Sequence, residues 1–274
     1  MRFHPSKRGS HALLAGSLLS GAMLGSGCNT FDDAPRGATS LREVMAPQTT
    51  PGQAAEMATD PYSAENRYRG TTLLSSADFG GAGVYIQLYV DGADDPDPSV
   101  RAASIRALGR HGDPEHAPLI IRGLADGDDF VRVEAARALQ RVHSEDAIEP
   151  LIRRIEEANE SNIDVRAAAA DALGQYRQKS VVLALIGALR DSRLAVNDRV
   201  QHSLMTLTGQ NFALDRQAWL DWYNRTNDLF AGARPYTYPV FSRKKKIIEY
   251  FPLVPPPPNE TTSTPVGMDP VLDG

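Results

Sequence analysis

Few residues of this chain combine a reactive side chain with a spacing that chemistry could use. Histidine can bind a metal ion or transfer a proton near neutral pH, so His111, His116, His143 and His202 are the first to consider. They are isolated from one another and are expected at helix ends, where histidines usually face solvent or cap the helix. A nucleophile beside a base, a glycine-rich phosphate loop and a carboxylate pair of suitable spacing are all missing. The sequence therefore predicts no catalytic residue, no cofactor and no metal site, with the four histidines as the remaining metal candidates.

A second group with possible chemistry is the basic run Arg243, Lys244, Lys245 and Lys246, which an apolar segment follows at once. Such a run could contact anionic lipid head groups or an acidic partner, with the apolar residues inserting beside it. Alternatively, it is a solvated basic run next to a short segment that packs on the folded body. Both interpretations stay open at this point.

The single cysteine, Cys28, follows an uncharged stretch of small and apolar residues at 12–27, which itself follows three basic residues. This layout is typical of a secretory signal, and sixteen residues with four glycines are short for a membrane span. The segment 24–28 resembles a bacterial lipobox, although Leu24 stands four places before the cysteine instead of three. The resemblance implies that Cys28 is acylated, for example with palmitate, and begins the mature chain. The alternative is an ordinary signal peptide with an incidental cysteine.

Export also bears on charge and location. The first 28 residues hold three basic residues and no acidic ones, so their removal changes the formal net charge from −5 to −8. An acidic, exported chain is not expected to bind nucleic acid, which requires a basic face. With one cysteine, no internal disulfide can form. Asn29 follows the cysteine, and by resemblance to the sorting rule of enteric bacteria this implies a lipid-anchored protein of the cell envelope, at the outer membrane and facing the periplasm.

The two ends of the chain differ from its centre. Residues 29–63 are polar and interrupted by four prolines, which predicts a flexible tether. Residues 232–274 are proline-rich and partly basic, and four consecutive prolines at 255–258 favour an extended conformation there. Neither end is expected to form a second domain.

The centre of the chain repeats itself. A Val-Arg pair with a leucine eight places after the valine begins at Val100, Val131 and Val165, and variant copies begin at Asn66 and Val196. Successive copies start 34, 31, 34 and 31 residues apart. In each copy an amphipathic segment, a short turn and a second apolar segment predict two antiparallel helices. We therefore expect an all-α fold, an α-solenoid of about five hairpins over residues 64–231, between disordered or extended terminal segments.

Each copy carries a charged pattern at its junction with the next. Aspartates crowd these junctions and can cap the helix that follows. The repeat arginines Arg67, Arg101, Arg132 and Arg166 could each reach such an aspartate in the neighbouring copy. We expect the resulting ladder of ion pairs to fix the register between stacked hairpins.

The segments 95–109 and 164–174, with their Val-Arg-Ala-Ala pattern, resemble HEAT repeats of the short type also found in phycobilin lyase subunits. The segment 207–212, with Trp219 and Trp222, resembles a closing element of such arrays, in which the tryptophans would cover the end of the core. The likeness covers roughly residues 64–230. Some HEAT-repeat proteins are hydroxylases that present His-Glu dipeptides to a di-iron centre, and this chain has no His-Glu dipeptide.

Repeat arrays of this kind present a long shaped surface, and we expect a concave face built from the second helices. The function expected from the sequence is that of a membrane-anchored HEAT-repeat scaffold, which is no enzyme and binds a protein or peptide partner in the cell envelope. Two alternatives remain: a metal-assisted or lyase-like enzyme on the same scaffold, and a purely structural envelope protein. Fold alone does not decide among them.

Overall fold

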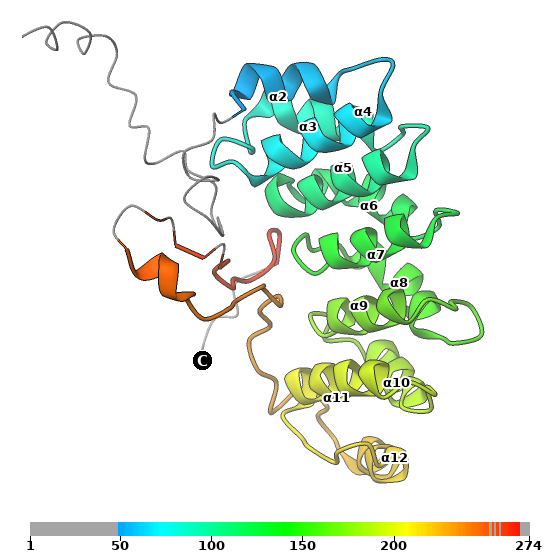
Figure 1. Ribbon diagram of the computed structural model, residues 1–274. Coiled ribbons are helices and arrows are strands. Elements are labelled where there is room, and N and C mark those ends of the chain that lie inside the picture. The colour runs from blue at the N-terminus through cyan, green and yellow to red at the C-terminus, as the bar shows by residue number, and fades with distance from the viewer. Residues whose placement is uncertain (1–48, 252–253, 255, 258, 269–274) are drawn as a thin grey trace, which may run out of the picture.

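The computed structural model describes residues 49–251, 254, 256–257 and 259–268. Within these residues it holds eleven α-helices and three short 3₁₀ helices, and no strand. Figure 1 shows the helices stacked in a single array. The α-helices are α2 (Pro51–Ala58), α3 (Ala64–Ser76), α4 (Gly83–Gly92), α5 (Pro98–His111), α6 (Ala117–Gly123), α7 (Asp129–Ala138), α8 (Ile148–Ile155), α9 (Ile163–Leu173), α10 (Lys179–Ala188), α11 (Leu194–Thr208) and α12 (Arg216–Arg225).

Ten of these helices form five hairpins, which confirms the predicted all-α solenoid. The odd-numbered helices from α3 to α11 are the first helices of the hairpins, and the even-numbered helices from α4 to α12 are the second ones. The first helices begin where the sequence predicts caps: Asp97 accepts the N–H of Ser99, and Asp128 accepts that of Phe130. None of the described helices is both long enough and apolar enough to cross a bilayer.

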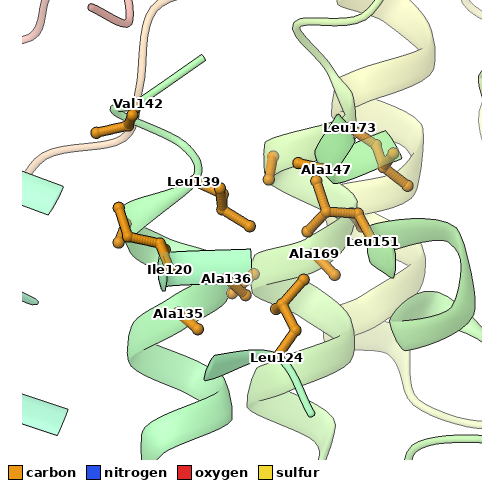
Figure 2. Packing of buried hydrophobic residues seen from close by; sticks show 14 of the residues in the cluster. Ile120, Leu124, Ala135, Ala136, Leu139, Val142, Ala147, Leu151, Ala169 and Leu173 are labelled. Carbon is orange, nitrogen blue, oxygen red and sulfur yellow. The ribbon is translucent and has the colours of Figure 1, made fainter. Parts of the chain in front are cut away.

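The core lies between the first and second helices of successive hairpins. In Figure 2, Ile120 and Leu124 from the α6 region meet Leu139, and Leu151 of α8 lies near Leu173 of α9. Small residues let the first helices approach closely: a Cβ atom added at Gly109 of α5 would lie 2.6 Å from the Cβ of Ala138.

The first helices form the continuous layer of the array. Helix α5 packs directly against α3 and α7, and α9 packs against α7 and α11. The second helices are shorter and pack chiefly on first helices, for example α8 on α9. Alanine is frequent on the first helices, as in α9, whereas leucine and isoleucine are frequent on the second helices, as in α8. The concave face expected from the second helices stays a prediction.

The N-terminal limit of the array differs from the sequence expectation. Helix α2 falls inside the predicted 29–63 tether, yet Ala54 and Ala58 are buried against α3. The capping box at Thr50, with Pro51 in the first turn, starts this helix, so in the structure the array begins before residue 64.

At the other end, Trp219 is fully buried, and its ring meets those of Phe212 and Trp222 edge-on. This contact covers the last part of the core, as the sequence analysis expected. Gly209 ends α11 with a φ of 70°, and an added Cβ would lie 2.1 Å from the carbonyl oxygen of Gly232. Glycine is required at that position, both by the left-handed backbone and by the space.

The described part of the C-terminal tail is extended and returns along the array, beside the C-terminal ends of the first helices (Figure 1). The N–H of Arg234 donates to Thr206 on α11, and further along the tail Val266 pairs with Val142 just after α7. Tyr236 and Pro265 are buried. The tail forms no second domain, as expected, but its described residues are bound to the solenoid over much of its length.

Candidate binding surface of the helical array

One edge of the array carries the repeat arginines, at the N-terminal ends of the first helices. The innermost is Arg166, whose Nε lies 2.6 Å from Asp191 Oδ2 and whose Nη2 lies 3.1 Å from Asp191 Oδ1. Its Nη1 donates to the carbonyl oxygen of Glu160 at 2.8 Å. The side chain of Arg166 is 2% exposed and that of Asp191 is 1% exposed. Because both groups are enclosed, removing either one would leave the other as an uncompensated buried charge.

The same geometry recurs along the edge, and we call this set of pairs the arginine ladder. Its other three pairs are Arg67 with Asp95, Arg101 with Asp126, and Arg132 with Glu160, at 2.6, 2.8 and 2.7 Å. Each acidic residue also accepts the backbone N–H of the residue two places later in its junction, as Asp126 does from Asp128.

The ladder departs from the sequence expectation at one rung, where the partner of Arg132 is Glu160 and not an aspartate. Asp164, the aspartate that follows Glu160 at this junction, is exposed. The acidic member stands six residues before the arginine of its own copy at Asp95, Asp126 and Glu160 alike. That spacing, more than the residue type, is the signal that would have found the pair.

The ladder residues are engaged with one another and have little capacity left for a partner. Burial works to raise the pKa of Asp95, Asp126 and Glu160, but the hydrogen bonds and charges of their arginines, together with a backbone N–H, outweigh it and hold each pKa below its usual value. These carboxylates are therefore ionised at neutral pH and fully matched. We interpret the ladder as the spine that fixes the hairpins, consistent with the role expected of it.

A second group of arginines lies towards the C-terminal ends of α5 and α7 and in the turn after α7, and we call it the arginine face. It comprises Arg106 and Arg110 of α5, Arg137 of α7, and Arg141 of the turn. Residues four apart on a helix share a face, as Arg106 and Arg110 do, and the second pair follows the first by the repeat period of 31 residues. Sequence analysis missed this face, although the two arginines of α5 recur 31 residues later.

The first half of the arginine face shares one carboxylate, that of Glu134. Arg137 Nη1 donates to Glu134 Oε1 at 3.0 Å, and Arg106 Nε lies 3.3 Å from Glu134 Oε2. Arg106 Nε and Nη2 nevertheless form no hydrogen bond within the described structure. The guanidinium of Arg106 also lies 6.0 Å from the centre of the Phe130 ring, which is 43% exposed. Two guanidinium groups on one carboxylate retain the capacity to bind another.

The other half of the arginine face already holds a carboxylate from the tail. Arg110 Nη2 lies 2.5 Å from Glu260 Oε1, and Arg141 Nη2 is bonded to Glu260 Oε2. The guanidinium of Arg141 also lies 4.6 Å from the ring centre of Tyr238 in the tail. Burial works to raise the pKa of Glu260, but the two arginines keep it below its usual value. Two arginines, one from α5 and one from the turn after α7, thus clamp an acidic side chain of the tail.

Backbone bonds hold the tail next to this clamp. The N–H of Val266 donates to the carbonyl of Arg141 at 2.7 Å, and the N–H of His143 donates to the carbonyl of Val266 at 2.9 Å. These two bonds form the parallel bridge between Val142 and Val266. The array therefore binds a segment of extended chain through both its backbone and a charged side chain, as peptide-binding surfaces do.

A buried polar cluster lies further along the same edge. Tyr236 of the tail is buried close enough to Asp171 and Tyr176 for their charges to act on it. Burial raises the pKa of Asp171 to about 6, against the attraction of Arg199 at 3.7 Å. The hydroxyl groups of Tyr176 and Tyr236 find no hydrogen-bond partner among the described residues. Polar groups on this edge are thus less completely matched than those of the ladder.

The histidines that could have bound a metal lie apart from one another. His111 bonds through Nε2 to the carbonyl of Ser75, and burial lowers its pKa. His143 contacts Gln175 through Nδ1 and stacks on Tyr176, whereas His202 is exposed on α11. His116 bonds to the backbone of Asp113. Among the described residues, no three histidine, cysteine, aspartate or glutamate side chains gather as metal ligands would.

The remaining predicted site residues lie at the two ends of the chain. Cys28 lies outside the described residues. In the basic run, Arg243 is paired with Glu249, with Nη1 to Oε2 at 2.8 Å, whereas Lys244, Lys245 and Lys246 are exposed.

Comparison with known proteins agrees with the repeat architecture. Residues 86–162 match a family model of HEAT repeats, and residues 165–191 match the model of the PBS lyase HEAT-like repeat. A HEAT repeat-containing taxis protein of Halobacterium salinarum is 33% identical over 132 residues, which cover 40% of this chain and 31% of that protein. The chain thus spans about a third of that relative's length.

Among solved structures, the complex of CpcE and CpcF of phycocyanin lyase from Nostoc sp. PCC7120 superposes with a TM-score of 0.52 and 19% identity. The match covers 61% of this chain and 68% of that one, and it shows a shared fold. Human deoxyhypusine hydroxylase in complex with glycerol matches with a TM-score of 0.29 and 17% identity, over 68% of this chain and 88% of that one. The chain therefore carries HEAT repeats, followed by a PBS lyase-type HEAT-like repeat, within a solenoid.

Proposed function

We propose that this protein is a membrane-anchored HEAT-repeat scaffold that binds an extended, acidic segment of a protein partner on its arginine face, in the cell envelope. The observation that supports this most is the clamp of Arg110 and Arg141 on Glu260. The tail is held as a bound peptide would be, through a carboxylate and through backbone hydrogen bonds.

Charge supports the same choice of partner. The whole chain has a formal net charge of −5, yet four arginines and only two glutamates meet on the arginine face. Such a local concentration of positive charge attracts acidic segments, whereas the remaining, acidic surface of this chain repels them. The exposed ring of Phe130 beside Arg106 adds an apolar contact at the half of the face that the tail leaves open.

We further propose that the protein binds without catalysing a reaction. The ladder arginines and acids are paired with one another, and the arginine face is built to hold carboxylates. The relatives named above share its repeats over part of their length, so the taxis and lyase roles in their names stay with them.

The test is capture of partners from detergent-solubilised membranes with the tagged chain and matched variants. Arg106→Gln with Arg137→Gln removes two charges from the open half of the face and should reduce capture about tenfold or more, because each of these partly exposed charged contacts contributes on the order of 1 kcal/mol. Arg153→Gln on α8, an exposed arginine of a second helix, is the control and should leave capture unchanged. Equal capture by all variants, with circular dichroism unchanged, would refute the arginine face as the binding site.

Membrane anchoring has a test of its own. We propose that Cys28 carries the lipid, so Cys28→Ser should leave an unprocessed precursor or release the protein from membranes. The measurement is the mass of the purified chain together with its partition into detergent. An unchanged mass and an unchanged partition in the variant would contradict lipidation.

A further inference from the structure

A loop of the tail, residues 241–251, concentrates exposed apolar side chains in a way that the array does not. Phe241, Ile247, Tyr250 and Phe251 are 60%, 86%, 74% and 63% exposed. Of the thirteen large hydrophobic residues that are exposed in the described part of the chain, these four fall within eleven residues. Figure 1 shows the 3₁₀ helix of this loop, Ile247–Tyr250, on the side of the tail away from the helices. A water-exposed apolar cluster of this kind marks a contact surface.

The loop is held in shape by its own ion pair. Arg243 donates to both carboxylate oxygens of Glu249, at 2.8 and 2.5 Å, and the N–H of Lys246 donates to Glu249 Oε2 at 2.6 Å. These bonds lower the pKa of Glu249 to about 2, so the pair stays charged at any physiological pH. Asn259 accepts the N–H of Arg243 and donates to its carbonyl, closing the loop at its base. The exposed residues are therefore presented on a preformed turn.

The ion pair also decides which charges are free. Arg243 is occupied by Glu249, which leaves Lys244, Lys245 and Lys246 as three exposed cations beside the apolar residues. The ammonium group of Lys245 lies 5.8 Å from the centre of the Tyr250 ring. Lysines with aromatic and aliphatic neighbours are the composition of interfacial membrane-binding segments, in which the rings enter the head-group region and the ammonium groups stay at the phosphates.

We propose that this basic loop docks on a bilayer surface rich in anionic phospholipids. Three points favour lipid over a protein partner. The loop lies on the side of the tail away from the helices, its free cations are lysines and not the bidentate arginines that recognise protein carboxylates, and its four apolar residues lie within eleven residues and are each at least 60% exposed. The inference extends the proposed membrane anchoring, because a basic patch supplies a second membrane contact besides an acylated cysteine.

The experiment is co-sedimentation of the full chain with vesicles of phosphatidylcholine alone or mixed with phosphatidylglycerol, so that residues 1–48 are the same in every sample. The wild-type chain should bind the anionic vesicles more strongly, and added salt should remove the difference. Lys244→Ala, Lys245→Ala and Lys246→Ala together should lower that excess about a hundredfold. Each lysine near an anionic surface contributes on the order of 1 kcal/mol, which is about fivefold in binding.

A second variant tests the apolar contribution: Ile247→Ser with Tyr250→Ser should weaken binding to the anionic vesicles at high salt as well. The control is Lys179→Ala, which removes one exposed lysine at the start of α10. Equal binding of wild type to both kinds of vesicle, or a triple variant that binds as wild type does, would overturn the proposal. If the triple variant instead loses a captured protein and keeps its lipid binding, the loop is a protein contact. Cys28→Ser does not alter these comparisons, so failure of the acylation proposal would be seen separately.

Discussion

The two edges of the solenoid are held by opposite kinds of interaction. The arginine ladder at the N-terminal ends of the first helices joins each hairpin to the next, between residues 25 to 28 apart in the chain. The edge at the C-terminal ends is joined by the tail, through contacts such as Arg110 with Glu260, which are 150 residues apart. Asp95, Asp126 and Glu160 of the ladder have lowered pKa values, whereas the buried Asp171 on the tail edge has a raised one.

The difference shows which edge is built for stability and which for exchange. Periodic pairs form as neighbouring hairpins meet, and each charge has a partner, so the ladder edge is fixed once the repeats stack. The tail edge is covered only when the tail, which is distant in sequence, docks on it. The hydroxyl groups of Tyr176 and Tyr236 and the carboxyl group of Asp171 then remain incompletely hydrogen-bonded among the described residues. A surface closed by a loosely matched segment of its own chain is one that another segment can occupy.

The largest effect is expected where the ladder is most buried. Arg166→Ala leaves Asp191 as an isolated carboxylate that is 1% exposed, so the free energy of unfolding should fall by about 3–5 kcal/mol. Urea denaturation followed by circular dichroism measures this loss. A loss under about 1 kcal/mol would mean that the ladder contributes no more than exposed ion pairs do.

The next effect is on the tail edge and depends on pH. Burial raises the pKa of Asp171 to about 6 in the folded protein, above its ordinary value. The neutral carboxyl group is therefore favoured by folding, and this stabilisation is fully present at low pH and is lost as the pH rises through about 6. At pH 7 to 8 the ionised side chain destabilises the fold by about 2–3 kcal/mol. Asp171→Asn should therefore be more stable than wild type at pH 8, with the gain vanishing near pH 4. Thermal melts across this range measure it, and a gain that does not depend on pH would contradict the shift.

A smaller effect is expected from the clamp. Glu260→Gln weakens two charge-assisted hydrogen bonds of a partly exposed side chain and should reduce tail docking by about 1–2 kcal/mol. Limited proteolysis should then cut residues 234–268 faster while the helices resist as before. Arg166→Ala is the contrasting variant, since it should expose the helices themselves. Cleavage of the tail at the wild-type rate in Glu260→Gln would show that the clamp does not hold it.

The smallest effect belongs to the outer part of the ladder. In the pair of Arg101 and Asp126 the side chains are 20% and 16% exposed, so water can replace much of what Arg101→Ala removes. The expected loss is about 1 kcal/mol, well below that of Arg166→Ala. Urea denaturation of the two variants together measures how strongly burial determines the contribution of an Arg–Asp pair of the ladder. Equal losses at both positions would argue against that dependence.

The sequence predicted the periodic parts of the molecule and missed the parts that depend on distant contacts. The repeat spacing was enough for the hairpins, and the Val-Arg pairs were enough for the ladder, since both recur every 31 or 34 residues. Only the identity of one partner, Glu160, escaped, because its loop is longer than the others. The sequence predicts a tether at helix α2, because eight residues that begin with Pro51 and Gly52 are too few to show a helical period of apolar residues.

The candidate site was harder to predict because its parts are distant in the chain. In the sequence, Arg106 and Arg137 look like any other arginines of amphipathic helices. Only the stacking of α5 on α7 brings both of them to Glu134. The docking of Glu260 depends on the return path of an irregular segment, for which no periodicity exists. The pairing of Arg243 with Glu249 was similarly hidden, and it alters which charges of the basic run are free.

The tail also has a mechanical consequence for the array. Solenoids stretch like springs, because small rotations at each interface add along the stack. Here the tail, whose loop is closed by bonds such as that from the N–H of Tyr238 to the carbonyl of Ser263, joins Thr206 on α11 to the end of α7, in parallel with that spring. Tension applied along the stack of hairpins must first break the contacts of Glu260 and Val266 with the array before the array can lengthen. The molecule should therefore be stiff up to a threshold force and compliant above it, and detachment of the tail would switch its elasticity.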